Sequence, residues 1–336
     1  MRKFIFALVL LLGVVYILSR LADLQSIFIT LQQGKWFFLL PAVLLQAVWL
    51  MNVGMSYRYI YKILGMPEKY NRLVRLASAA TFLNVIAPVG GMSGISVFLS
   101  DARERHFSSA KVTVAGVLFV LFDYIGFLIV LVAGLWVLAR RDILTWPEIS
   151  ASILLAAGAL GLASVLYLGM HSGKTLGAVL AWCSRVVNRL LRPFIHRNFL
   201  LEERALSFAR DAEDGLRALK SGPKDVALLV FFAVTGKVLL IGVMLMMFLA
   251  FNVPLNTGTL IAGFSIGYLF LIVSPTPAGL GIVEGALTLA LSSLYVPLAE
   301  ATVVVVAYRS VTFWFPLLVG MVSFRTLNRI GEINKT

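Results

Sequence analysis

The chain has 336 residues, of which 60% are hydrophobic and only 13% are charged. Ordinary soluble domains are roughly a quarter charged, so the composition excludes a soluble globule and indicates a polytopic membrane protein. The net charge is +13. Because the cations lie between apolar segments, they predict topology signals and anionic-lipid contacts, and no nucleic-acid partner is expected.

The first apolar segment follows Met1-Arg2-Lys3 and resembles a signal peptide. No Ala-x-Ala-type cleavage site follows it, so we interpret it as an uncleaved first helix. A straight span needs about 20 apolar residues to cross a hydrocarbon core of roughly 30 Å. Six segments are predicted to span the membrane: 4–18, 36–57, 112–138, 151–170, 226–251 and 301–322.

Two further apolar segments contain helix breakers. Segment 73–100 is interrupted at Pro88-Val89-Gly90-Gly91, and segment 259–296 is interrupted between Pro275 and Gly281. Proline ends a helix, glycine permits unusual backbone angles, and unwound backbone is tolerated at membrane depth only beside protein or a wet cavity. Each segment is therefore predicted to be a re-entrant hairpin. A single kinked span is the alternative for 73–100.

Charge asymmetry orients the predicted segments. If 73–100 re-enters from the cytoplasmic side and 259–296 from the opposite side, most Lys and Arg residues fall on one side. Both termini are then predicted to be cytoplasmic, in the cell membrane. Only a few cations would lie outside: Arg20, Lys35, Arg140 and Arg141.

These segments predict an all-α polytopic membrane protein. It would have six spanning helices plus two oppositely inserted re-entrant helical hairpins, in an inverted-repeat architecture. The two breaker loops share a short Pro-x-Gly core, which weakly supports the repeat. The whole chain, 1–336, is read as one domain with four parts: a first half 1–170, a basic cytoplasmic linker 171–225, a second half 226–322 and a cytoplasmic tail 323–336.

The linker carries a basic stripe. Arg185, Arg189 and Arg192 recur at helical spacing and share one face. This pattern predicts an interfacial helix that binds anionic lipid. The alternative is that these cations only determine topology, because cytoplasmic loops are commonly basic.

Four ionisable residues lie inside apolar segments: Asp123, Lys237, Glu284 and Arg309. Such groups are costly in a bilayer and need a partner or water. Arg309 is predicted to hold an anionic headgroup, with Glu284 and Asp123 organising the site. In the alternative, Arg309 neutralises Glu284 or Asp123 and joins the two repeats. Lys237 is interpreted as structural or interfacial.

The breaker loops can supply the remaining groups of a binding site. Freed amides at a half-helix N-terminus can bind an anion, and nearby hydroxyl and amide side chains add donors. The alternative is a surface turn between two short helices. The candidate loop residues are Asn84, Pro88, Gly90, Gly91, Ser274, Pro277, Gly279 and Gly281.

No nucleotide-binding or hydrolase motif occurs in the sequence, and no cluster of catalytic carboxylates. We therefore expect no catalytic residues, no cofactor and no metal site, and we expect that the protein is not an enzyme. Two rival classes are a transferase acting on a polyprenyl carrier and a scaffold subunit of a lipid- or polyprenyl-modifying enzyme. The scaffold would bind anionic lipid through the basic linker. A solute or ion transporter of similar build is a third.

The stretch from Ser274 to Glu284 resembles the Pro-x-Pro-Gly-Gly-Leu-Gly-x-x-Glu signature of the lysylphosphatidylglycerol synthase transmembrane family, and departs from it at Ala278. Tyr308-Arg309 is similar to that family's Tyr-Arg element, in a late helix that would end near Pro316 and Gly320. The resemblance adds Tyr308 to the candidate site. It implies a flippase-like membrane domain.

That resemblance implies translocation of a lipid between leaflets, with the headgroup in a midplane cavity between the two hairpins. The substrates expected are anionic or aminoacylated phospholipids, glycolipids or polyprenyl phosphates. The chain stops at Thr336, soon after its last apolar segment, so the family's aminoacyl-transferase domain is not expected here. Other expected partners are a separate synthase or transferase and a second copy of the chain.

Overall fold

A computed structural model describes residues 30–86, 92–105, 107–171, 223–274 and 276–333, with isolated positions at 175, 177, 178 and 213. The described chain is helical and contains no strand. Its elements are α2 (Trp36–Ile63), α3 (Tyr70–Ile86), α4 (Met92–Glu104), α5 (Ser109–Arg140), α6 (Trp146–His171), α9 (Pro223–Ala250), α10 (Thr257–Val273), η2 (Pro277–Gly279), α11 (Ile282–Ser293), α12 (Leu298–Arg309), η3 (Ser310–Trp314) and α13 (Phe315–Ile333).

Five stretches of helix are long and apolar enough to cross a membrane. They lie in α2, α5, α6, α9 and the continuous run from α12 into α13. This confirms a multi-pass membrane protein and five of the predicted apolar segments as helices. The predicted span 4–18 lies outside the described residues, as do Arg185, Arg189 and Arg192 of the linker.

The last span is longer than the sequence predicts. The helix does not end near Pro316 and Gly320 but continues to Ile333, so much of the predicted tail 323–336 is helical. The run contains a π-helical turn, Ser310–Trp314, immediately before Pro316. Proline removes a backbone donor and its ring crowds the carbonyl four residues earlier. The wider turn accommodates the proline, so the helix does not break there.

Segment 73–100 forms two short helices, not one kinked span. The start of α3 and the end of α4 are joined by two ion pairs, Arg72–Asp101 and Arg105–Glu68. At the inner end, the backbone N–H of Gly94 donates to Oδ1 of Asn84 at 2.7 Å. The chain therefore enters and leaves this helix pair at the same end, as a hairpin does.

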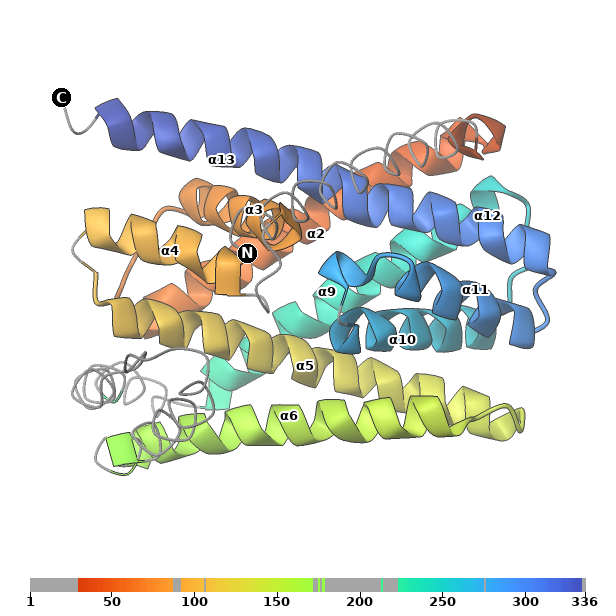
Figure 1. The fold of residues 1–336 in the computed structure, drawn as a ribbon, viewed down its shortest axis with the longest axis horizontal. Helices are drawn as coiled ribbons and strands as arrows, with labels where there is room; N and C mark the ends of the chain where they lie inside the picture. The colour runs from red at the N-terminus through yellow and green to blue at the C-terminus, as the bar shows by residue number, and fades with distance from the viewer. Residues whose placement is uncertain are drawn as a thin grey trace, which may run out of the picture.

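The second interrupted segment, 259–296, forms α10, the short turn η2 and α11. In Figure 1, α3 and α4 lie at one end of the long axis of the molecule, and α10 and α11 lie towards the other. The outer end of α10 is held by Arg141, whose guanidinium donates to Asn256 and Thr259. The turn η2 contacts α3 near the middle of the bundle. The two helix pairs thus approach each other from opposite ends.

Large apolar side chains remain exposed along the outer helices, including Leu44 on α2, Val132 on α5 and Leu160 on α6. The interior is closely packed by residues such as Phe127, Met244 and Phe264. Such an exterior is as expected for helices that face lipid, because lipid tails are as apolar as leucine.

Candidate functional site

The second hairpin unwinds between Val273, where α10 ends, and Ile282, where α11 begins. Three residues in this loop have a positive φ: Ala278 at 51°, Gly279 at 73° and Gly281 at 80°. Glycine adopts such angles freely, whereas a left-handed conformation costs other residues roughly 1–2 kcal/mol. The two glycines therefore fit the turn, and Ala278 is held there by its surroundings.

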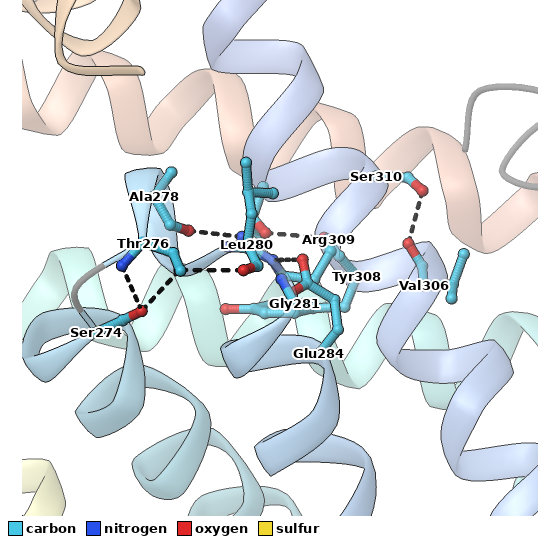
Figure 2. Close-up of polar contacts among 11 residues, drawn as sticks. Ser274, Thr276, Ala278, Leu280, Gly281, Glu284, Val306, Tyr308, Arg309 and Ser310 are labelled. Atoms are coloured by element: carbon cyan, nitrogen blue, oxygen red, sulfur yellow. Dashed lines mark hydrogen bonds and ion pairs between the residues drawn. The ribbon is translucent and has the colours of Figure 1, made fainter. Parts of the chain in front are cut away.

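Hydroxyl groups bridge this loop internally. The Ser274 and Thr276 hydroxyls lie 2.8 Å apart, and the Thr276 hydroxyl donates to the carbonyl of Leu280 at 3.0 Å. The Thr276 backbone N–H donates to Ser274 Oγ at 3.2 Å. Figure 2 shows these bonds spanning the loop. Ser274 thus shapes the backbone around the predicted site, and Pro277 lies within the η2 turn.

Arg309 connects the last span to this loop. Its Nε donates to Oε1 of Glu284 at 2.8 Å, and its Nη2 donates to the carbonyl of Ala278 at 2.7 Å. The other carboxylate oxygen of Glu284 accepts from the N–H of Gly281 at 2.7 Å. Arg309 is buried, with only 8% of its surface exposed. These contacts match the expected neutralisation of Arg309 by Glu284, but both residues lie in the second half of the chain, so the pair does not join the two predicted repeats. Binding of an anionic headgroup stays a prediction.

Glu284 caps α11 because its carboxylate lies in the first helical turn, where the helix dipole favours negative charge. Arg309 is the last residue of α12, directly before the π-helical turn. Such turns are rare and often occur at functional sites. In Figure 2, Tyr308 lies beside Arg309 next to the loop. Tyr308 is itself buried.

A cavity of about 180 Å³ lies beside Arg309. Residues from five parts of the fold line it: α2, α9, the second hairpin, α12 and the π-helical turn. The polar lining side chains are Gln46, Trp49, Tyr268, Tyr308, Arg309 and Thr312. None of the described residues of α3 or α4 is among the lining residues. This cavity lies against the second hairpin, and a cavity between the two hairpins stays a prediction.

A second buried ion pair lies near this cavity. The Lys237 ammonium on α9 donates to Oδ1 of Asp123 on α5 at 2.5 Å, and to the hydroxyl of Tyr268 at 2.5 Å. The Tyr268 hydroxyl in turn donates to Oδ2 of Asp123 at 3.0 Å. The Lys237 side chain is 1% exposed and that of Asp123 is 28% exposed. Asp123 therefore pairs with Lys237 and not with Arg309. Lys237 lies in the interior and not at an interface.

This cluster of Asp123, Lys237 and Tyr268 separates two cavities. Tyr268 lines the larger one, and Asp123 lines a smaller one of about 20 Å³ between α2, α5 and α9. Trp49 borders both. Within the part of the chain that the structure describes, no group of three or more His, Cys, Asp or Glu residues could hold a metal ion.

The family profile described as lysylphosphatidylglycerol synthase TM region matches residues 4–320. The chain belongs to this family. No curated protein matches the chain. The match covers both hairpins and the Arg309–Glu284 contact, so the resemblance seen in the Ser274–Glu284 motif extends over nearly the whole chain.

The first hairpin of this family member contributes little to the described site. Asn84 binds the backbone of its own hairpin, and Pro88, Gly90 and Gly91 lie outside the described residues. The second hairpin supplies Glu284, Gly279 and Gly281, and α12 supplies Tyr308 and Arg309. These five residues do lie together, around one loop and the wall of one cavity.

Sequence reasoning missed two polar side chains of the interior. Tyr268 looks like an ordinary aromatic residue of an apolar helix, and only the packing of α10 against α5 and α9 brings it to Asp123 and Lys237. Gln46 is the one amide between Trp36 and Met51. An isolated amide in an apolar span is a signal that could have identified it.

Proposed function

We propose that this membrane protein moves a lipid between the two leaflets of the cell membrane. The headgroup would enter the cavity beside Arg309 while the acyl chains stay in the surrounding lipid. The observation that carries the proposal is the unwound loop bound by the buried Arg309, which itself lines a cavity within a multi-pass membrane fold. Unwound backbone at membrane depth is expected only where protein or a wet cavity meets it.

The arrangement of the hairpins supports this function. In transporters built from inverted repeats, broken helices meet near the bilayer midplane and form the substrate site. Here the two short helix pairs approach from opposite ends of the bundle (Figure 1), and η2 contacts α3 between them. We propose that both pairs are re-entrant and that residues 1–170 and 226–322 are the two repeats.

The distribution of cations supports the proposed orientation. Arg72 and Arg105 lie at the outer end of the first hairpin, and Arg141 lies at the outer end of the second. These ends are opposite ends of the bundle (Figure 1). Because cytoplasmic loops carry an excess of Lys and Arg, we propose that the first hairpin opens to the cytoplasm and that both termini lie there.

The loop would have two arrangements, one with the Arg309–Glu284 pair formed and one with it broken. With the pair closed, Arg309 holds the carbonyl of Ala278 and the N-terminus of α11 together. A headgroup oxygen that approaches the guanidinium competes with Glu284 for its planar donors. Exchange of one partner for the other would release the loop and open the cavity. We propose no group-transfer chemistry for this chain; a separate synthase or transferase would modify the lipid.

Lipid movement in proteoliposomes tests the function. Acyl-labelled fluorescent phosphatidylglycerol, aminoacyl-phosphatidylglycerol and polyprenyl phosphate would be compared by dithionite quenching. We expect the wild-type protein to move at least one of them, and Arg309→Ala and Glu284→Ala to lose that movement. Arg325→Ala removes the same charge from an exposed site on α13 and should leave it unchanged.

Absence of movement for every lipid, with folded and correctly inserted protein, would refute the proposal. The scaffold function would then be favoured. Neutralising Arg185, Arg189 and Arg192 would next be tested for loss of binding to anionic vesicles.

A further inference from the structure

Gln46 is a fully buried amide with no hydrogen-bond partner among the described residues. It lies within α2, 0% of its surface is exposed, and neither its Nε2 nor its Oε1 bonds to another group. An unsatisfied buried polar group is unfavourable and rare in folded proteins. The Gln46 side chain lines the cavity beside Arg309. No water-sized group reaches either amide atom in this structure, so we expect the amide to gain its partner when a ligand widens the cavity.

The charges around this cavity are already balanced. Among the described residues that line the cavity, Arg309 is the one Arg, Lys, Asp or Glu, and Glu284 compensates it at 2.8 Å. Next to the cavity, Asp123 and Lys237 compensate each other at 2.5 Å. A cationic or an anionic group in the cavity would therefore meet no net opposite charge. An uncharged group loses the least hydration free energy when it moves from water into the cavity.

The hydrogen-bond donors and acceptors that line the cavity restrict the chemistry of the headgroup further. One planar amide offers both donors and acceptors, as does the hydroxyl of Tyr308; the Tyr268 hydroxyl already donates to Asp123. An ammonium group has donors only, and a phosphate at neutral pH is mainly an acceptor. A hydroxyl both donates and accepts, so neighbouring hydroxyls match Gln46 best. The aromatic rings of Trp49, Phe264 and Tyr268 can pack against the carbon-bound hydrogens of a sugar or polyol.

We propose that this cavity binds an uncharged, hydroxyl-rich headgroup, a sugar or a polyol, and that Gln46 selects it. That the headgroup belongs to a lipid rests on the proposed function. A cavity of about 180 Å³ is small beside the roughly 300–1,000 Å³ of typical ligand pockets, so it suits a headgroup and not a whole lipid.

The test compares headgroups in proteoliposomes that contain wild type, Gln46→Leu or Gln33→Leu. Gln33 is an exposed glutamine near the start of the described chain, so it is the matched control. The acyl-labelled probes are monoglucosyl-diacylglycerol, phosphatidylglycerol, phosphatidylcholine and lysyl-phosphatidylglycerol. Monoglucosyl-diacylglycerol is uncharged, and phosphatidylglycerol carries free hydroxyls beyond its anionic phosphate; phosphatidylcholine has no hydroxyl, and the lysyl lipid is cationic.

We expect the hydroxylated probes to move faster than phosphatidylcholine. Gln46→Leu should reduce that preference about fivefold to tenfold, the effect of one hydrogen bond, and leave phosphatidylcholine unchanged. If only one hydroxylated probe moves, and Gln46→Leu reduces its movement, that result would show whether the cavity takes a sugar or a glycerol headgroup. Equal movement of all probes, an equal effect of Gln46→Leu on all of them, or preference for the cationic lipid would overturn the inference while leaving translocation intact.

Lipid retention gives a readout that does not depend on transport. Native mass spectrometry in a polyoxyethylene detergent would measure the fraction of protein that keeps added glucosyl lipid or phosphatidylcholine. Selective retention of the glucosyl lipid that is lost in Gln46→Leu would support the site even if no lipid moves. Equal retention in both proteins would contradict it. Thermal unfolding of Gln46→Leu, expected at or above the wild-type temperature, controls for folding.

Discussion

Removal of either partner of the Asp123–Lys237 pair should destabilise the protein unequally. Asp123→Asn leaves the Lys237 ammonium, 1% exposed, without a counter-charge. Breaking a buried pair in this way costs about 3–5 kcal/mol. Lys237→Met leaves Asp123, whose side chain is 28% exposed and still accepts from Tyr268 at 3.0 Å. We expect that second loss to be smaller, about 1–2 kcal/mol.

The double variant measures the coupling energy between Asp123 and Lys237. Asp123→Asn with Lys237→Met removes both charges, so it should resemble Lys237→Met alone. The coupling between the two sites would then be about 3–5 kcal/mol, equal to the effect of Asp123→Asn.

Thermal unfolding in detergent, followed by intrinsic tryptophan fluorescence, would measure these differences. The Asp123→Asn midpoint should fall by about 5–10 °C. Glu104→Gln changes an exposed carboxylate at the end of α4 and should have no effect. Equal losses in the two single variants, or a double variant whose loss is their sum, would refute the view that Lys237 is the desolvated partner.

Two substitutions of glycine test the backbone of the site and the packing behind it. Gly281→Ala should lower stability by about 1–3 kcal/mol, because its φ is 80°. Gly285→Ala, in the adjacent helix where a Cβ meets nothing within 4 Å, should raise it by about 0.5–1 kcal/mol; equal effects in thermal unfolding would contradict the strain argument. Gly320→Ala should cost about 1–3 kcal/mol, because a Cβ there would lie 2.3 Å from the Ser78 carbonyl oxygen. Gly158→Ala, on α6 with open space around it, is its control, and an unchanged unfolding midpoint for Gly320→Ala would show that α3 and α13 separate easily.

The breakers and the charges made much of this site predictable. Proline and glycine between 275 and 281 identify the unwound loop, and Glu284 follows at the distance that places it in the first turn of the next helix. Arg309 is too deep in its span to reach the membrane surface, so a buried partner was required. The sequence left Glu284 and Asp123 as alternatives, and the contact is with Glu284.

The remaining features depend on tertiary packing. Asp123, Lys237 and Tyr268 come from three helices far apart in the chain, and no local spacing relates them. The cavity is lined by residues of α2, α9, α10, α11, α12 and the π-helical turn, which no local spacing brings together. Pro316 looks like the end of a helix by local rules, but packing of α13 against α3 keeps the helix intact beyond it.

The π-helical turn at Ser310–Trp314 changes the direction in which side chains point before and after it in the last span. Each residue of an α-helix advances the side-chain direction by about 100°, so the extra residue of a π turn rotates everything after it by about that angle. The face of α12 that directs Arg309 to the loop and the face of α13 that presents Gly320 to α3 are therefore out of phase. An uninterrupted α-helix could satisfy only one of these two contacts. One extra residue in the π-helical turn thus lets Arg309 face the loop while Gly320 faces α3.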